Sequence, residues 1–210
     1  MIQFTLNWFN GAVIANPNSI NQVALYRQKS VGGAWLSTGF TPANNLPITA
    51  VTTTSPLVSE NKIWEFKVQN ICTVGGPIDN NNGIIEQLHF QCITPVLSFT
   101  QTTATAVLNV LGLDITKARF TLHKVSDDSV VFGPTIVLPV GNSITCLATG
   151  LTGSTGYYWE IDLYSTVNGA EIHSFNTDQL NSPCVSIDFI TDASICSPIT
   201  DLDATSIDIT

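Results

Sequence analysis

The sequence predicts an all-β protein made of two tandem β-sandwiches followed by a short acidic C-terminal tail. Three observations support this fold class. Thr, Val and Ile are abundant, and such β-branched residues favour strands. Short alternating segments are separated by Gly, Pro, Asn and Asp, as in sandwiches. Segments of the first half also recur in the second, and 210 residues suffice for two domains of about 100 residues each.

The repeat fixes the expected domain organisation. Similar segments occur in the same order in both halves, which two related domains explain most simply. We expect a first domain over residues 1–93, a second over 94–184 and a tail over 185–210. The matched segments are Trp64–Val68 with Trp159–Leu163 and Val23–Lys29 with Ala118–Lys124, both at an offset of 95, and Leu6–Trp8 with Leu108–Val110 at an offset of 102.

Alternating apolar residues between turn signals locate the strands of each domain. Asn168-Gly169 is the strongest hairpin signal, because both residues tolerate positive φ. In the first domain we expect strands at Phe4–Phe9, Val23–Lys29, Ala34–Phe40, Ile48–Thr54, Ile63–Cys72 and Ile84–Cys92, with a break at Val74–Gly83. In the second we expect Val96–Thr100, Ala104–Val110, Ala118–Val125, Val130–Leu138, Ser143–Ala148, Tyr157–Thr166 and Glu171–Asn176.

One segment of the second domain carries a family motif. Leu151–Tyr157, with the sequence LTGSTGY, resembles the fibronectin type III signature Leu-x-Pro-Gly-Thr-x-Tyr, with Gly153 in place of Pro. The resemblance covers residues 1–184 and implies two fibronectin-III/immunoglobulin-like sandwiches. It also implies that the Tyr157 hydroxyl ties down the preceding loop as a tyrosine corner. In the first domain Lys62 occupies the matching position, so we expect no corner there.

The same resemblance implies an open strand edge. Phe4–Phe9 corresponds to the second strand of the sandwich, and no first strand precedes it. Unpaired edges are normally covered. The tail offers Val185, Ile187 and Phe189 in alternation, and later Ile207 and Ile209. We hypothesise that the tail, or a strand of a partner, pairs with this edge; the alternatives are a tail that pairs with its own second domain or stays disordered.

Charge excludes some partners. The formal net charge is −9, which disfavours nucleic acid because nucleic acid binding requires clustered Lys and Arg. Residues 1–93 are balanced, and the excess of acids lies in residues 94–184 and in the tail. No apolar run approaches the roughly 18 residues that span a membrane, and no signal peptide is evident at the N-terminus.

Five Cys residues occur without a CxxC pair, which disfavours zinc-ribbon and thioredoxin-like sites. We expect most of them to be buried free thiols, as in a reducing compartment. Cys72 and Cys92 form an alternative pair across a hairpin, and sequence alone does not establish the geometry. The five are Cys72, Cys92, Cys146, Cys184 and Cys196.

No catalytic, cofactor-binding or metal-binding residues are predicted, and we expect no enzyme activity. His89, His123 and His173 lie on separate expected strands or turns, so they favour ordinary strand histidines over a catalytic or metal site. Asp79–Gly83 differs from a calcium loop in the position of its Gly and in lacking the final Glu, and it predicts a hairpin tip.

Other acids and the aromatic residues give the same answer. Asp127-Asp128 predicts a turn, and Asp201-Leu202-Asp203 an acidic terminus. Trp35 and Tyr158 are the aromatics expected to be exposed, without a cluster that would make a carbohydrate platform. The other three tryptophans, Trp8, Trp64 and Trp159, are expected in the cores.

These features favour a structural or interaction protein. Charged residues make up only 11% of the chain, and low charge suits surfaces that are buried against partners. Bacteriophage particles are similar in carrying immunoglobulin-like modules. We therefore expect a virion subunit, such as a capsid-decorating, neck or tail protein, whose partners are other virion proteins or copies of itself. The alternative is a spacer or carbohydrate-associated module at a bacterial surface.

Overall fold

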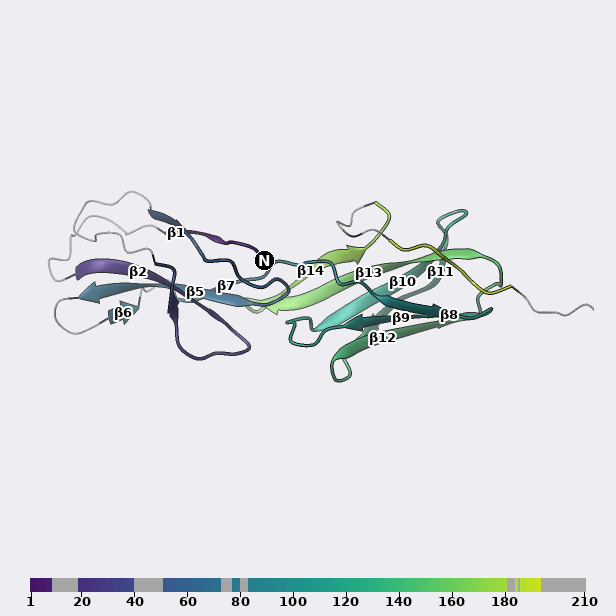
Figure 1. Cartoon of the computed structure of the whole chain (residues 1–210), viewed down its shortest axis with the longest axis horizontal. Helices are drawn as coiled ribbons and strands as arrows, with labels where there is room; N and C mark the ends of the chain where they lie inside the picture. The colour runs from purple at the N-terminus through teal and green to yellow at the C-terminus, as the bar shows by residue number, and fades with distance from the viewer. Residues whose placement is uncertain are drawn as a thin grey trace, which may run out of the picture.

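The computed structural model describes residues 1–8, 19–39, 51–72, 77–79, 83–180, 184 and 186–193. Within these ranges the regular structure is entirely β-strand, and the strands form two sandwiches that follow one another along the long axis (Figure 1). The pairings among β1–β7 and those among β8–β15 form separate sheets. In the part of the chain described, no helix is long and apolar enough to span a membrane.

The second sandwich consists of a three-stranded and a five-stranded antiparallel sheet. One sheet has the order β12-β9-β8, and the other has the order β11-β10-β13-β14, with β15 also paired to β13. Leaving the short β15 aside, three strands pack on four in the order of a fibronectin-III/immunoglobulin-like sandwich. This confirms the predicted fold class. The strands are β8 (Val96–Phe99), β9 (Thr103–Asn109), β10 (Lys117–Lys124), β11 (Val130–Val137), β12 (Ser143–Thr149), β13 (Gly156–Val167), β14 (Ala170–Thr177) and β15 (Phe189–Ile190).

The described part of the first sandwich repeats this plan with fewer strands. Among the described residues β1 pairs only with β4, while the facing sheet has the order β3-β2-β5-β6, with β7 also paired to β5. Matching the two sandwiches by order, β1 corresponds to β9 and β5 to β13. The strands are β1 (Thr5–Trp8), β2 (Ser19–Gln28), β3 (Leu36–Ser37), β4 (Val51–Thr54), β5 (Trp64–Cys72), β6 (Pro77–Asp79) and β7 (Ile85–Gln87).

Each predicted strand contains or overlaps an observed one, and two short strands were missed. β6 falls inside the predicted break at Val74–Gly83, so that part of the expectation is wrong: the last strand of the first sandwich is split into β6 and β7. β15 lies in the predicted tail. Both are two- or three-residue strands, too short for alternation to reveal.

The core of the second sandwich is completely enclosed. Side chains of β9 and β12 pack against those of β10 and β13, and Phe120, Leu122 and Ile161 are fully buried. Trp159 meets Phe120 edge-on, with ring centroids 5.8 Å apart. Burial of so many large side chains supplies the main stabilisation of this sandwich. Trp8 and Trp159 are buried as expected.

The tyrosine corner is present. The Tyr157 hydroxyl accepts a hydrogen bond from the Thr152 backbone N–H at 3.0 Å and donates one to the Thr152 carbonyl at 3.4 Å. Tyr157 is buried in the core, so its ring and its hydroxyl together hold the loop before β13. The fibronectin type III resemblance therefore predicted this contact correctly.

A loop of the second sandwich binds the end of the first. The Asp114 carboxylate accepts a hydrogen bond from the Ile63 backbone N–H at 2.7 Å, and the Asp114 N–H donates to the Asn61 carbonyl at 2.8 Å. The Asn61 side chain is buried and bonds to the Gln91 backbone in both directions. These contacts fix the linker between the sandwiches.

A second contact between the sandwiches uses the predicted Asn168-Gly169 turn. The Asn168 backbone N–H donates to the Glu86 carboxylate at 2.7 Å, and its side chain exchanges two hydrogen bonds with the Glu86 backbone. Lys29 forms an ion pair with the same carboxylate at 2.6 Å. The Lys29 hydrogen bond is the largest cause of a lowered Glu86 pKa. The hairpin turn thus docks on β7.

Cys92 and Cys184 form a disulfide, with Cα atoms 5.6 Å apart. The expectation of free thiols is wrong for these two residues, and so is the alternative pair of Cys72 with Cys92. The two half-cystines lie 92 positions apart in sequence and meet only because the strands of the second sandwich bring their neighbours together. Cys146 is a buried free thiol, as expected, whereas Cys196 lies outside the described residues.

The first residues of the predicted tail belong to the second sandwich. Phe189 is buried and pairs with Tyr157, and its ring lies 5.2 Å from that of Phe99. The Thr191 hydroxyl donates to the Thr152 carbonyl at 2.7 Å. Residues 189–190 therefore pair with the second sandwich of their own chain, which was one of the alternatives considered for the tail. Residues 194–210 lie outside the described range.

Candidate functional site

The candidate site is the edge of β1 that faces away from β4. Ser55 N–H donates to the Phe4 carbonyl at 2.8 Å, which makes Phe4 a hydrogen-bonded partner across the β1–β4 pair. Because backbone groups alternate in direction along a strand, the N–H and C=O groups of Thr5 and Asn7 point to the other side. Among the described residues, no strand pairs with that side.

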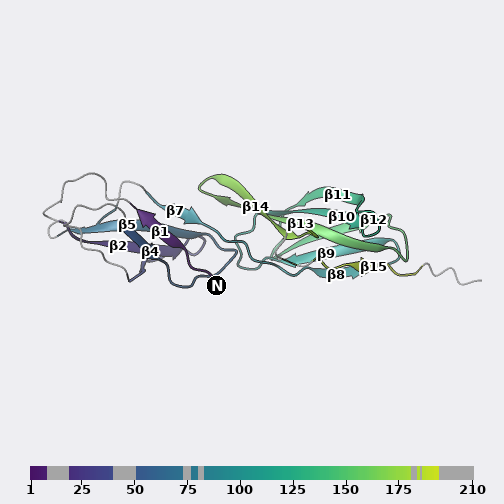
Figure 2. The same cartoon turned by 90° about the horizontal axis from the view of Figure 1, so that it is seen from above.

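A groove of about 490 Å³ runs along β1. Seen from above, β4 lies on one side of β1 and β7 lies toward the other (Figure 2). The Phe4 ring meets the Phe66 ring edge-on at 5.4 Å, and Phe4 and Leu6 are only partly buried. The groove is lined by Phe4, residues 5–8 of β1, residues 66–68 of β5, and Gly83, Ile85 and Gln87 on the β7 side.

The second sandwich shows what closes this position. There β9, the counterpart of β1, has β12 on one edge and β8 on the other. Ala104, Ala106 and Leu108 of β9 are fully buried, and Leu97 of β8 packs against the same core. In the first sandwich the place of β8 is a groove, and the apolar side chains beside it retain solvent exposure. A strand edge flanked by apolar side chains is suited to bind another strand.

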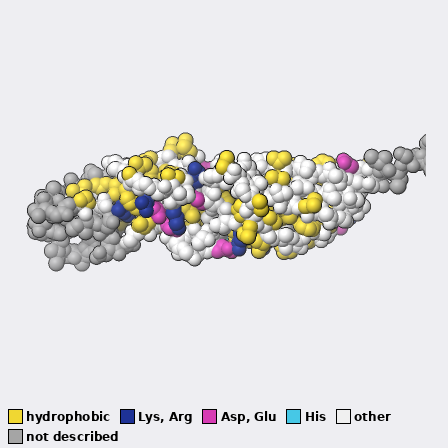
Figure 3. Space-filling model, turned by 90° about the horizontal axis from the view of Figure 1, so that it is seen from below, with side chains coloured by type: hydrophobic (Ala, Val, Ile, Leu, Met, Phe, Trp, Pro, Cys, Tyr) yellow, Lys and Arg dark blue, Asp and Glu magenta, His cyan; other side chains and the backbone are white. Residues whose placement is uncertain are grey.

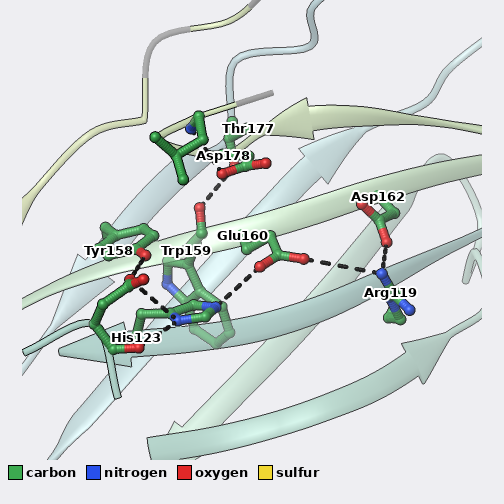
Figure 4. Close-up of polar contacts among 10 residues, drawn as sticks. Arg119, His123, Tyr158, Trp159, Glu160, Asp162, Thr177 and Asp178 are labelled. Atoms are coloured by element: carbon green, nitrogen blue, oxygen red, sulfur yellow. Dashed lines mark hydrogen bonds and ion pairs between the residues drawn. The ribbon is translucent and has the colours of Figure 1, made fainter. Parts of the chain in front are cut away.

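A polar cluster covers the outer face of β10 and β13 in the second sandwich (Figure 4). The His123 ring stacks on Tyr158 with centroids 4.9 Å apart. His123 Nε2 lies 3.0 Å from a Glu160 oxygen, and Nδ1 lies 3.2 Å from the Asp128 carbonyl oxygen. The Tyr158 hydroxyl donates to the Asp128 carboxylate. Burial, and next this hydrogen bond, raise the pKa of Tyr158.

Arg119 extends this cluster to a buried acid. Its guanidinium forms an ion pair with Asp162 and lies 3.9 Å from Glu160. Asp162 is 1% exposed, and burial raises the pKa of its carboxyl against the opposing effect of Arg119. A hollow of about 420 Å³ lies beside His123 and Glu160. Ion pairs therefore join Arg119, His123, Glu160 and Asp162 into one cluster.

The three histidines do not converge. His123 is buried in the polar cluster, His89 is exposed before the linker, and the His173 ring lies tilted against that of Tyr164 with centroids 5.2 Å apart. In the described part of the chain, no group of three or more His, Cys, Asp or Glu residues could hold a metal ion. Asp127 and Asp128 lie in and beside a turn, where Ser129 bonds to the Asp127 carboxylate. Positions 80–82 and 201–203, which include the other acid motifs, lie outside the described residues.

The aromatic residues expected to be exposed lie apart from each other. Trp35 belongs to the first sandwich and is half-buried, with Arg27 Cζ and Lys67 Nζ lying 4.4 and 4.6 Å from its ring centroid. Lys and Arg side chains gather over the first sandwich on the face seen from below (Figure 3). Tyr158 belongs to the second sandwich and is buried, so the expectation that it is exposed is wrong. Trp64 is only partly buried, so the expectation that it is a core residue is also wrong.

Comparison with known proteins finds structural neighbours only. No protein family and no curated protein matches the sequence. The two-domain fibronectin type III segment of chicken tenascin is 10% identical, with a TM-score of 0.46 and coverage of 82% of this chain and 90% of that one. The chicken interferon gamma receptor alpha chain is 10% identical, with a TM-score of 0.38 and coverage of 90% and 92%.

The FN1–FN3 domains of chicken CNTN1 are 12% identical, with a TM-score of 0.34 and coverage of 90% of this chain. The chain spans 62% of that segment's length. The fold is fibronectin-III-like. The strand order and the tyrosine corner establish this fold, and at such low identity no function follows from the likeness.

Proposed function

We propose that this chain is a non-enzymatic structural or interaction subunit of a larger assembly, and that the assembly is a bacteriophage virion. The chain acts through protein–protein contacts as a capsid-decorating, neck or tail component. The observation that carries the proposal is the edge of β1 that pairs with no strand of the described residues and lies beside an apolar groove. Such an edge binds a protein strand through main-chain hydrogen bonds and binds the apolar side chains of that strand in the groove.

The composition and the domain contacts support this role. Only 11% of residues are charged, which limits the desolvation cost of burying the surface against partners. The linker contacts of Asn61 and Asp114, together with the Asn168 turn on Glu86, hold the two sandwiches as a spacer of fixed direction. A spacer with a binding edge at one end suits a repeating assembly.

The test is the location of the protein in an infected culture. Mass spectrometry of density-purified particles should find the chain at a fixed ratio to the major capsid protein. That ratio should persist through a high-salt wash, because the proposed contacts are strand pairing and apolar burial rather than surface ion pairs. Recovery of the chain in the bacterial envelope fraction, with none in the particles, would refute the virion assignment.

A module of a bacterial surface is the second candidate, and the Cys92–Cys184 disulfide favours it. Disulfides persist in oxidising places such as cell surfaces and the periplasm, as well as on released particles. Labelling of intact cells with a membrane-impermeant reagent distinguishes the two. Labelled chain on uninfected cells supports the surface module, and labelled chain confined to released particles supports the virion.

A further inference from the structure

The open edge of β1 belongs to the first sandwich, and β15, the last described strand, pairs with the beginning of β13 in the second sandwich. We propose that residues 194–210 of one copy pair with β1 in the groove of a second copy, so that the chains associate head to tail. This inference rests on the proposed function and names the partner as the protein itself. The site is the groove described above, and its occupant is the 17-residue segment that follows Ala193.

The backbone of β1 offers the necessary groups. Thr5 and Asn7 direct their N–H and C=O groups away from β4, and both side chains are exposed. A strand added antiparallel on this side would occupy the place that β8 takes beside β9 in the second sandwich. The three-stranded order of the second sandwich would thereby be reproduced in the first.

The side chains of the C-terminal segment suit the groove. Ile207 and Ile209 alternate with polar residues, so that in a strand both point to one face. The groove presents Phe4, Leu6 and Phe66 to that face, and each of these can bury an isoleucine. Asp208 would point to solvent on the opposite face. Burial of the two isoleucines would favour pairing, against the cost of ordering the segment.

The direction in which the chain leaves the second sandwich favours a neighbouring copy. β13 begins at Gly156 and ends at Val167, beside the Asn168 turn that contacts the first sandwich. β15 is antiparallel to β13 and pairs with its beginning, so the chain after Ile190 runs away from the first sandwich. β15 lies at the end of the second sandwich that is remote from the first (Figure 2).

The length of the C-terminal segment also favours binding to a second copy over binding to its own β1. To reach its own β1, the segment would reverse and first run back along the length of β13, which is roughly 36 Å at about 3.3 Å per residue. Seventeen extended residues span at most about 58 Å. The reversal and the remaining path to β1 would leave too few residues to form a paired strand. A second copy placed end to end requires no reversal.

Such a contact joins two different surfaces and is therefore heterologous. It leaves an unused edge at one end and an unused segment at the other, so it generates open chains or closed rings. This property suits a repeated component of a particle, and it makes the mass depend on protein concentration.

The test uses two full-length variants that block opposite halves of the contact. Ile207→Asp with Ile209→Asp places charges where the segment should be buried. Thr5→Pro removes an N–H from the open edge while leaving the β1–β4 bonds intact, because that N–H points away from β4. Thr5→Ala keeps the N–H and is the matched control. Circular dichroism and a melting curve for each variant establish that it is folded.

Light scattering after size exclusion, repeated over a range of concentrations, gives the outcome. The wild type and Thr5→Ala should rise above the 22.6 kDa monomer with concentration, and each blocked variant should stay at 22.6 kDa. An equimolar mixture of the two blocked variants should form a dimer of twice that mass, because one supplies an intact edge and the other an intact segment. Loss of folding in one variant cannot produce that dimer.

Two results would overturn the inference. One is a wild type that stays monomeric at every concentration, together with no binding of a synthetic 194–210 peptide to the folded Ile207→Asp/Ile209→Asp chain. The other is a wild-type oligomer that the aspartate substitutions leave unchanged; assembly would then use another surface. In the second case the structural role proposed above would survive while the partner named here would not.

Discussion

Replacement of Cys92 and Cys184 by Ser should destabilise the second sandwich strongly. The disulfide closes a loop with a sequence separation of 92. In the chain-entropy model, a disulfide that closes a loop of this length stabilises the folded state by about 4.5 kcal/mol at 25 °C, because it restricts the unfolded chain. The folded state should change little, because the Asn176 side chain holds the Ile93 backbone through two hydrogen bonds of 2.7 Å without help from the disulfide. Nearly the whole loss should therefore come from the unfolded state.

Urea unfolding followed by Trp fluorescence measures this loss, since Trp159 is buried in the affected core. With a urea dependence of about 1–2 kcal/mol per molar, the midpoint should fall by roughly 2–4 M. Wild-type protein unfolded in reductant should match the double Ser variant and serves as its control. A loss below about 1 kcal/mol in both would show that the unfolded chain is not restricted as the loop length requires, and would refute the reasoning.

Three further predictions concern titratable groups. Arg119→Met should cost about 2–3 kcal/mol by leaving the buried Asp162 unpaired, and Arg119→Met with Asp162→Leu should recover most of it in the same urea assay; an unrecovered loss would contradict this. Because the Glu86 pKa is lowered in the folded state, its carboxylate stabilises the fold at pH values above 4.5, and this contribution is lost as pH falls through the lower folded pKa. The difference in melting temperature between wild type and Glu86→Gln should therefore vanish in acid. A difference that stays constant with pH would contradict this prediction. Burial raises the Cys146 pKa to about 11, so peptide mapping after alkylation at neutral pH should find Cys146 unmodified in the folded chain and modified after denaturation.

Much of the fold could be predicted because strands carry local signals. The alternation in Ala118–Val125 and Tyr157–Thr166 reflects one face buried in the core, and the observed strands match those ranges closely. The Asn168-Gly169 turn and the Tyr157 corner depend on residues near in sequence, so motifs revealed them. The open edge of β1 was expected from the fibronectin type III resemblance, in which Phe4–Phe9 corresponds to the second strand of the sandwich.

The remaining features depend on contacts that alternation does not encode. On the outer face of a strand a polar residue signals only exposure. In the structure, however, His123 and Asp162 on that face are buried, and Arg119 and Glu160 are partly buried. The Cys92–Cys184 pair depends on residues 92 positions apart. The groove beside β1 could not be predicted, because its walls come from β5 and β7, which are distant from β1 in sequence.

The disulfide also determines how the protein would carry tension. A pull on the C-terminal segment reaches Cys184, crosses the sulfur bridge to Cys92 and continues into the first sandwich. The short β15–β13 pairing could separate, yet the covalent path would bypass the residues between the two half-cystines, which include strands β8–β14. The second sandwich would then bear none of the applied force. Reduction of the bond would place that domain in series, where it would have to resist the load by its own folding.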